Sequence, residues 1–240
     1  EDSILHSHTQ QALIIVTSHD RLGSTGRKTG FYYDEMAVPY WALVDAGLEV
    51  HLASIAGGVA PADPGSLGSA DDRPPAVTRF LADADAVEKI HNTRRIDDID
   101  PDRYSVVFLP GGHGTMWDFP ESQALATVIG RAYDNGAVIG AVCHGPAGLV
   151  AARRADGRPL VEGLRVNSFT NAEEAAVGLT EIVPFLLESR LRELGGRFES
   201  APNFQPKAVR DGRLITGQNP ASAPLVAEEM LRALAILRRR

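Results

Sequence analysis

The stretch Ala137-Val138-Ile139-Gly140-Ala141-Val142-Cys143-His144-Gly145-Pro146 contains the only cysteine of the chain. Its apolar first part is typical of an interior parallel strand, and the glycine and proline after the cysteine are typical of a helix start. A sharp strand-to-helix turn lifts the side chain at its apex above the sheet and leaves backbone N–H groups free beside it. The pattern therefore predicts a nucleophile elbow with Cys143 at its apex.

The position of Cys143 also predicts a reactive thiol. A helix N-terminus carries a partial positive charge, which can lower the pKa of a thiol well below its ordinary value of about 8.5 and make a thiolate at neutral pH. His144 lies next to it in the chain. A lone cysteine is more often a small buried hydrophobic residue, and only the elbow pattern favours the reactive alternative here.

Length and composition fit one domain of α/β size. The 240 residues are 44% hydrophobic, so we expect a large core and a single domain over residues 1–240. The net charge of -7 and the absence of a basic stripe predict no nucleic-acid partner. A single cysteine cannot form an internal disulfide, no stretch approaches the roughly 20 apolar residues that cross a bilayer, and residues 1–11 lack a signal pattern. We therefore expect a soluble, cytoplasmic protein that does not act at a membrane.

Strand-like and helix-like segments alternate along the chain. Predicted strands cover 12–18, 49–54, 105–109, 137–142, 197–200, 208–210 and 213–216, and predicted helices cover 34–46 with Pro39 as an interruption, 77–90, 122–135, 145–152, 183–194 and 220–237. Residues 55–75 are rich in Gly, Pro, Asp and Ser and are predicted to form an irregular surface excursion. This order indicates a doubly wound, mostly parallel sheet sandwiched by helices, with its site at the carboxyl ends of the strands.

Two further segments carry candidate site residues. Leu109-Pro110-Gly111-Gly112-His113-Gly114 follows a predicted buried strand, and its glycines would let backbone N–H groups face a developing anion, although such a loop alone is more often a structural turn. Glu173 and Glu174 open a predicted helix with Asn171 as its expected N-cap, and by themselves they are ordinary residues that complement the helix dipole. No Cys/His cluster has metal-ligand spacing, so we predict no metal.

Jointly, five stretches resemble the ThiJ/PfpI superfamily, which has the class I glutamine amidotransferase-like, flavodoxin-like fold. The stretches are 29–35 with Pro39, 109–114, 141–146, 169–174 and 216–222. They follow the family order over almost the whole chain and most resemble the branch of heat-shock chaperones and cofactor-independent glyoxalases that turn methylglyoxal into lactate. Family members are usually dimers, so the resemblance also implies a homodimer.

The resemblance implies a catalytic role for each residue of a triad and for one further acid. Cys143 would be the nucleophile, His144 its neighbour, and Glu174 the third member, with Glu173 as the alternative. Glu35 matches a family glutamate that lies beside the cysteine and can exchange a proton with it or with the substrate.

The loop after the third predicted strand would bind the substrate. The resemblance assigns Gly111, Gly112 and His113 to oxyanion or substrate binding. The N–H of Gly112, with that of His144, would form the oxyanion hole that a thiohemiacetal or acyl intermediate requires.

These roles imply a small 2-oxoaldehyde as substrate and no cofactor. The thiolate of Cys143 would attack the aldehyde carbon, Glu35 or His144 would carry a proton, and hydrolysis of a thioester would release a 2-hydroxy acid. Deglycation of early methylglyoxal adducts would use the same groups. Two other classes stay open: a PfpI-type cysteine peptidase or amidase with an open groove, and a stress holdase chaperone or redox sensor.

Overall fold

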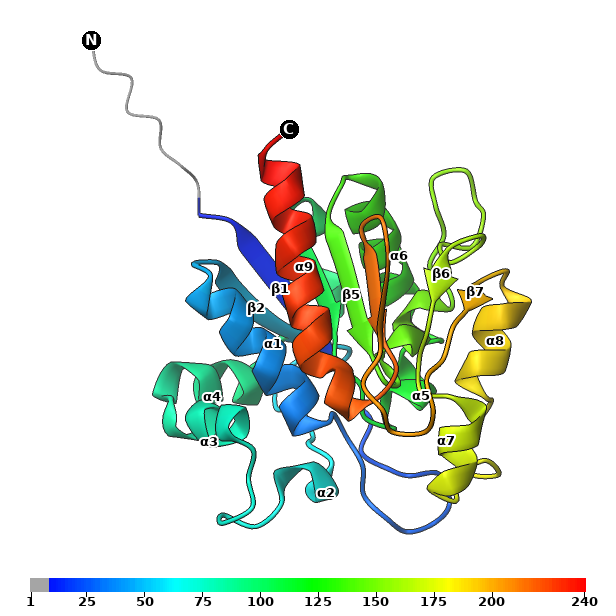
Figure 1. Cartoon of the computed structure of the whole chain (residues 1–240). Helices are drawn as coiled ribbons and strands as arrows, with labels where there is room; N and C mark the ends of the chain where they lie inside the picture. The colour runs from blue at the N-terminus through cyan, green and yellow to red at the C-terminus, as the bar shows by residue number, and fades with distance from the viewer. Residues whose placement is uncertain (1–8) are drawn as a thin grey trace.

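The computed structural model describes residues 9–240, and its centre is a seven-stranded sheet with the order β3-β2-β1-β4-β5-β9-β8 (Figure 1). The strands are β1 Gln11–Val16, β2 Glu49–Ser54, β3 Arg94–Arg95, β4 Val106–Leu109, β5 Val138–Val142, β8 Ala208–Asp211 and β9 Leu214–Gly217. Only the β8–β9 hairpin is antiparallel within this sheet. A second, two-stranded sheet pairs β6 (Arg165–Val166) with β7 (Arg197–Phe198). The doubly wound, mostly parallel sheet expected from the sequence is confirmed.

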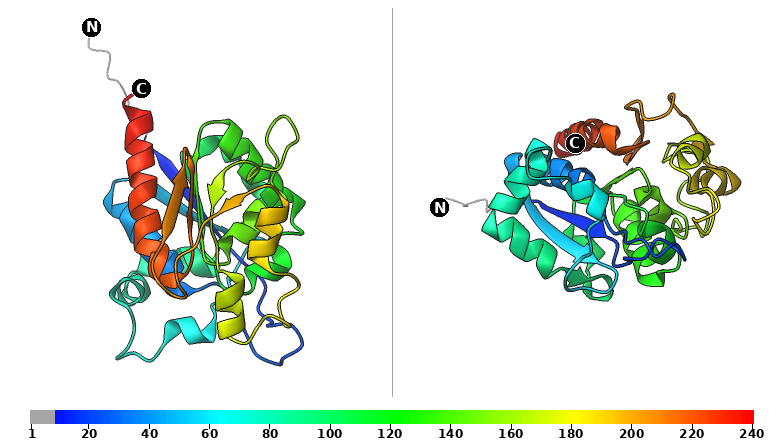
Figure 2. Two further views of the ribbon diagram at one scale, coloured as in Figure 1. Left: turned by 45° about the vertical axis from the view of Figure 1, so that its right-hand side comes forward. Right: turned by 90° about the horizontal axis from the view of Figure 1, so that it is seen from below.

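Helices cover both faces of the sheet because its inner strands are apolar on both sides. In β1, Ala12, Ile14 and Val16 belong to one core, and Leu13 and Ile15 belong to the other. The first core packs under α1 (Tyr33–Asp45), α3 (Pro75–Ala82), α4 (Ala84–His91) and α9 (Ala223–Arg238), and the second under α5 (Thr115–Asp118), α6 (Gln123–Asp134) and α8 (Leu187–Glu193). Figure 2 shows the two layers of helices on opposite sides of the strands. Within residues 9–240, none of the helices has the length and apolar character that spanning a membrane requires.

Three expectations about the first half of the chain need correction. The helix expected over 77–90 is two helices, because Asp83 ends α3 and its carboxylate caps α4 by accepting a hydrogen bond from the N–H of Ala86 at 2.9 Å. The excursion at 55–75 is not separate from the core: it contains α2 (Pro64–Leu67), and the N–H of Phe31 donates to the carbonyl of Pro61 at 2.9 Å. α1 also continues through Pro39.

Four expectations about the second half also need correction. The helix expected after Cys143 is a five-residue 3-10 turn, Gly145–Leu149, and the last helix begins with another, Pro220–Ser222. The helix expected over 183–194 is confined to α8. The N-cap of α7 (Asn171–Ala176) is Thr170 rather than Asn171.

Gly145 lies where the elbow packs closely against the main chain at the end of β4. A β-carbon at this position would lie 2.1 Å from the carbonyl oxygen of Leu109, a main-chain atom that cannot rotate away. We expect Gly145→Ala to lower the free energy of unfolding by about 3 kcal/mol, because the elbow must move away from β4. Urea denaturation measures this change. Gly65→Ala is the control, since its added carbon meets only the Asp63 carboxylate at 3.3 Å, and equal stability of the two variants would contradict the prediction.

Candidate active site

Cys143 occupies the apex of the turn from β5 into the 3-10 turn, with φ of 61°. This left-handed backbone costs roughly 1–2 kcal/mol for a residue with a β-carbon, and such conformations cluster at functional sites. Two hydrogen bonds of 2.9 Å hold it: the N–H of Cys143 donates to the carbonyl of Gly217, and the N–H of Phe169 donates to the carbonyl of Cys143. The predicted elbow geometry is therefore present, fixed by the end of β9 and by the segment that leads into α7.

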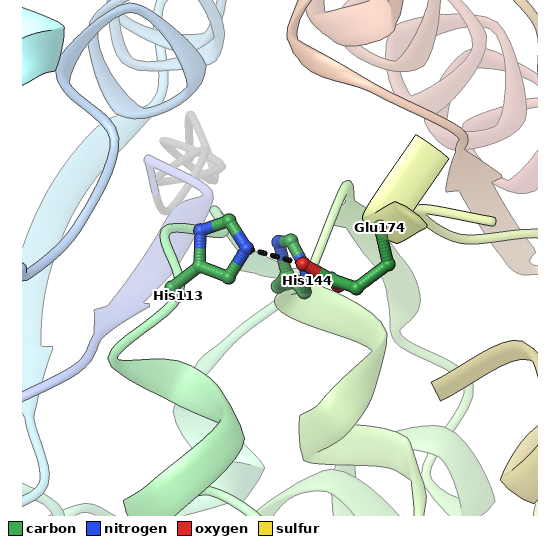
Figure 3. Close-up of side chains that lie close together, drawn as sticks. All are labelled: His113, His144 and Glu174. Carbon is green, nitrogen blue, oxygen red and sulfur yellow. Dashed lines mark hydrogen bonds and ion pairs between the residues drawn. The ribbon is translucent and has the colours of Figure 1, made fainter. Parts of the chain in front are cut away.

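Two histidines, His113 and His144, share the carboxylate of Glu174 (Figure 3). Nε2 of His144 lies 2.7 Å from Oε2 of Glu174, and Nε2 of His113 lies 2.7 Å from Oε1 of the same residue. Nδ1 of His144 lies 3.5 Å from Sγ of Cys143. The structure thus brings Cys143, His144 and Glu174 into one continuous line, and His113 joins it from the loop after β4.

Glu173, the alternative third member, has other partners. Its Oε1 accepts a hydrogen bond from the N–H of Thr170 at 3.0 Å, which completes a capping box at the start of α7. Its Oε2 accepts from the N–H of Phe204 at 2.7 Å and from the side-chain amide of Asn219 at 3.0 Å. Glu173 therefore ties three segments together and does not contact His144 by a hydrogen bond.

Glu35 is fully buried in α1, next to the elbow. Its Oε1 accepts a hydrogen bond from the N–H of Gly111 at 2.8 Å, and its Oε2 has no hydrogen-bond partner within residues 9–240. Burial raises the pKa of Glu35 to about 8, although the bond from Gly111 and the nearby thiol of Cys143 oppose this change. The carboxyl is therefore mainly protonated at pH 7, with a proton available on the oxygen that lacks a partner.

The expectation of a resting thiolate is wrong. Burial raises the pKa of the Cys143 thiol well above its ordinary value, and the negative charge of Glu174 raises it further. The helix that was expected to lower this pKa is only a five-residue 3-10 turn, which has few aligned peptide dipoles. The thiol is neutral at rest, so it needs a base.

His144 is oriented to act as that base. Burial lowers its pKa, so the ring is neutral at pH 7. Burial alone would raise the pKa of Glu174, but its interactions with His144 and His113 outweigh this effect and lower the pKa to about 2. An ionised carboxylate can only accept hydrogen bonds, so Nε2 of His144 must carry the proton. The lone pair on Nδ1 then faces the thiol of Cys143.

Two backbone N–H groups beside the thiol can bind a developing negative charge. The N–H groups of Gly112 and His144 donate to no protein acceptor in the described part of the chain. Gly112 has φ of 108°, and a β-carbon there would lie 2.1 Å from the carbonyl oxygen of Gly30, so only glycine fits. The hydroxyl of Thr115 lies 2.9 Å from the carbonyl of Gly112 and 3.0 Å from that of His144, which joins the loop to the elbow.

These groups open into a cavity of about 360 Å³. Its lining residues are Leu22, Arg27, Lys28, Tyr32, Asp63, Gly112, His113, Cys143, His144, Phe169, Val177, Leu179, Phe204 and Pro220. Sequence reasoning identified the floor of this cavity but missed most of its walls, including Phe204, which has φ of 60°. The walls come from segments far apart in the chain, and of the wall residues only Tyr32, Phe169 and Pro220 lie within motifs already singled out.

The site also contains a potential set of metal ligands. One atom each from His113, His144 and Glu174 lies within 4.8 Å of the others. The carboxylate already accepts a hydrogen bond from each histidine, and an ion would have to replace both. The absence of a metal stays a prediction.

The sheet, the elbow and the buried line of Cys143, His144 and Glu174 define a class of α/β proteins with a cysteine at the apex of a strand-to-turn elbow. The profile of the DJ-1/PfpI family matches residues 29–233, and the chain belongs to this family, as the resemblance had implied. It is similar to Glyoxalase 3 of Candida albicans, with 30% identity over 93% of this chain and 98% of that protein. It is also similar to the glutathione-independent glyoxalase HSP31 of Saccharomyces cerevisiae, with 31% identity over 94% of this chain and 98% of that protein. The structure of Rapid Encystment Protein 24 kDa from Francisella tularensis superposes with a TM-score of 0.90 and 35% identity over 94% and 99% of the two chains.

Glu35→Gln should change how stability depends on pH. The pKa of Glu35 rises from 4.5 to about 8 on burial, so the parent protein loses stability as pH rises through this window. Glutamine stays neutral and can accept the same hydrogen bond from Gly111. We therefore expect the variant to lose less stability between pH 5 and pH 8, by on the order of a few kcal/mol. Urea denaturation at both pH values measures this, and parallel pH dependences would contradict it.

Glu174→Gln and Glu173→Gln should have different effects. An amide at position 174 can donate as well as accept, so the tautomer of His144 is no longer fixed, and we expect alkylation of Cys143 by iodoacetamide to slow by about tenfold. Glu173→Gln weakens the capping box and the bond to Phe204, and should instead lower the free energy of unfolding by about 1–2 kcal/mol. Alkylation rates and urea denaturation separate the two effects. The assignment is wrong if Glu173→Gln slows alkylation more.

Proposed function

We propose that the protein is a cofactor-independent glyoxalase that converts methylglyoxal or glyoxal into a 2-hydroxy acid. The observation that supports this most directly is the line of Cys143, His144 and Glu174 at the floor of a cavity large enough for a small molecule. Its similarity over nearly the full chain to proteins named glutathione-independent glyoxalases adds support.

The first step would form a covalent adduct on sulfur. His144 takes the thiol proton on Nδ1, and the sulfur of Cys143 adds to the aldehyde carbon, C1. The electron pair of the carbonyl bond moves to its oxygen, O1, where the N–H groups of Gly112 and His144 would stabilise the charge. Return of the proton from His144 to O1 gives a thiohemiacetal. The neutral carboxyl of Glu35 can donate its proton toward the sulfur and so stabilise the thiolate as it forms.

The second step would convert the thiohemiacetal into a thioester. A hydrogen moves from C1 to the neighbouring carbon, C2, so that C1 reaches the oxidation level of an acid while C2 becomes an alcohol. The oxidation and the reduction occur within one molecule, and no external electron carrier takes part. Water then cleaves the thioester, which releases the 2-hydroxy acid and restores the thiol of Cys143. Deglycation of early methylglyoxal adducts would use the same groups.

The other proposed classes have less support. A peptidase needs a groove for an extended chain, whereas a cavity of about 360 Å³ lies at the small end of the range for ligand pockets. A holdase needs a large apolar patch. The exposed large hydrophobic residues among those described are Val59, Val177, Phe204, Leu225 and Ile236, of which Val177 and Phe204 line the cavity. The homodimer stays a prediction.

Cys143→Ala should abolish lactate formation from methylglyoxal without changing the fold. The parent protein and the variant are incubated with methylglyoxal and no added thiol, and lactate is measured by chiral chromatography. Because the sulfur forms the covalent bond, we expect the variant to retain less than about 1% of the turnover, with an unchanged circular dichroism spectrum. A parallel sample treated with EDTA should turn over at the parental rate. Lactate formation by the alanine variant at a tenth of the parental rate or more would contradict the proposed chemistry.

A further inference from the structure

A second imidazole faces the cavity with one ring nitrogen unused. His113 comes from the loop after β4, lines the cavity beside Cys143, and its side chain is 17% exposed. Its Nε2 is bonded to Glu174, whereas its Nδ1 has no hydrogen-bond partner in the described part of the chain. The side chain therefore combines access to a bound molecule with a nitrogen that makes no structural contact.

Glu174 determines which nitrogen of His113 carries the proton. The carboxylate accepts one hydrogen bond at each oxygen, both at 2.7 Å, so the Nε2 atoms of His113 and His144 are both donors (Figure 3). An imidazole that donates through Nε2 in its neutral form keeps its lone pair on Nδ1. The lone pair of His144 faces the thiol at 3.5 Å. That of His113 is left for the substrate.

The other acid–base groups of the site are less suited to act at the substrate carbons. Glu35 is 0% exposed and does not line the cavity, and one of its oxygens is bound to Gly111. His144 has its basic nitrogen at the sulfur, where it handles the proton of the thiol and of O1. The rings of His113 and His144 are 4.0 Å apart between centroids, and His113 is the more accessible of the two, with 17% of its side chain exposed against 1% for His144.

We propose that His113 is the catalytic residue that moves the proton from C1 to C2, an inference that rests on the proposed glyoxalase function. Nδ1 takes the proton from C1 of the thiohemiacetal, the electron pair of that bond forms a C1–C2 double bond, and the C2 carbonyl pair moves to its oxygen, O2. The hydroxyl proton passes from O1 to O2. The imidazolium then returns its proton to C2, and the C1–O1 bond becomes the thioester carbonyl. Every proton and electron pair stays within the adduct and His113.

His113→Gln separates a catalytic role from a structural one. Glutamine keeps an N–H donor for Glu174 but has no basic nitrogen, so we expect alkylation of Cys143 by iodoacetamide to stay within about twofold of the parent. We expect kcat for lactate formation to fall about 100-fold or more with little change in KM, and the residual lactate to lose its enantiomeric excess. His91→Gln, an exposed histidine on α4, is the matched control and should behave as the parent. His113→Asn replaces the glutamine variant if that variant does not fold.

The outcomes that would overturn the proposal are distinct. A parental kcat in His113→Gln would show that His113 only positions Glu174. An equal loss of alkylation and of lactate formation would show that it acts through His144. If the parent protein itself forms no lactate although Cys143 is alkylated normally, the proposed function fails and this inference fails with it.

Discussion

The left-handed backbone at Cys143 is the constraint on which the rest of the site depends. It persists because both main-chain groups of Cys143 are hydrogen-bonded: its N–H donates to the carbonyl of Gly217 at the end of β9, and its carbonyl accepts from the N–H of Phe169 before α7. The same turn brings the elbow so close to the loop after β4 that side chains are excluded there. A β-carbon on Gly111 would lie 2.7 Å from Glu35 and 2.8 Å from the nitrogen of His144. Main-chain contacts therefore position the thiol, the N–H donors and the buried acid relative to one another.

Three glutamates serve this small region in three different ways, and their surroundings make the difference. Glu35 accepts one hydrogen bond, from the N–H of Gly111, and burial keeps it mainly neutral at pH 7. Glu174 is almost as deeply buried, but two imidazole N–H groups face it and keep it ionised. Both carboxylate oxygens of Glu173 accept structural hydrogen bonds: Oε1 from the N–H of Thr170 at the start of α7, and Oε2 from the N–H of Phe204 in the cavity wall. Of these two neighbouring residues, Glu173 therefore stabilises the fold, and Glu174 carries a negative charge that orients the two histidines.

The sequence was sufficient for the parallel sheet and the elbow, because apolar runs and the Gly145-Pro146 pair are local signals. It could not separate Glu173 from Glu174 through the helix dipole, which treats both alike. A local signal did exist: Thr170 and Glu173 form the S/T-x-x-E pattern of a capping box, and it assigns Glu173 to the cap. The pKa of the thiol depends on burial by segments distant in the chain, and no local pattern contains that information.

The neutral resting thiol also bears on which functions the site suits. A redox sensor needs a thiolate that oxidants can reach, because oxidation proceeds from the thiolate. Cys143 lines the cavity, so a small oxidant can reach it, but burial raises the pKa of the thiol and the thiolate is missing at rest. A nucleophile generated in place needs the opposite arrangement: a base within reach of the thiol, and N–H donors that stabilise charge only after it has moved to the substrate oxygen. His144 and Gly112 provide those two parts, so the geometry favours a thiol that is activated during turnover over one that stands ready to be oxidised.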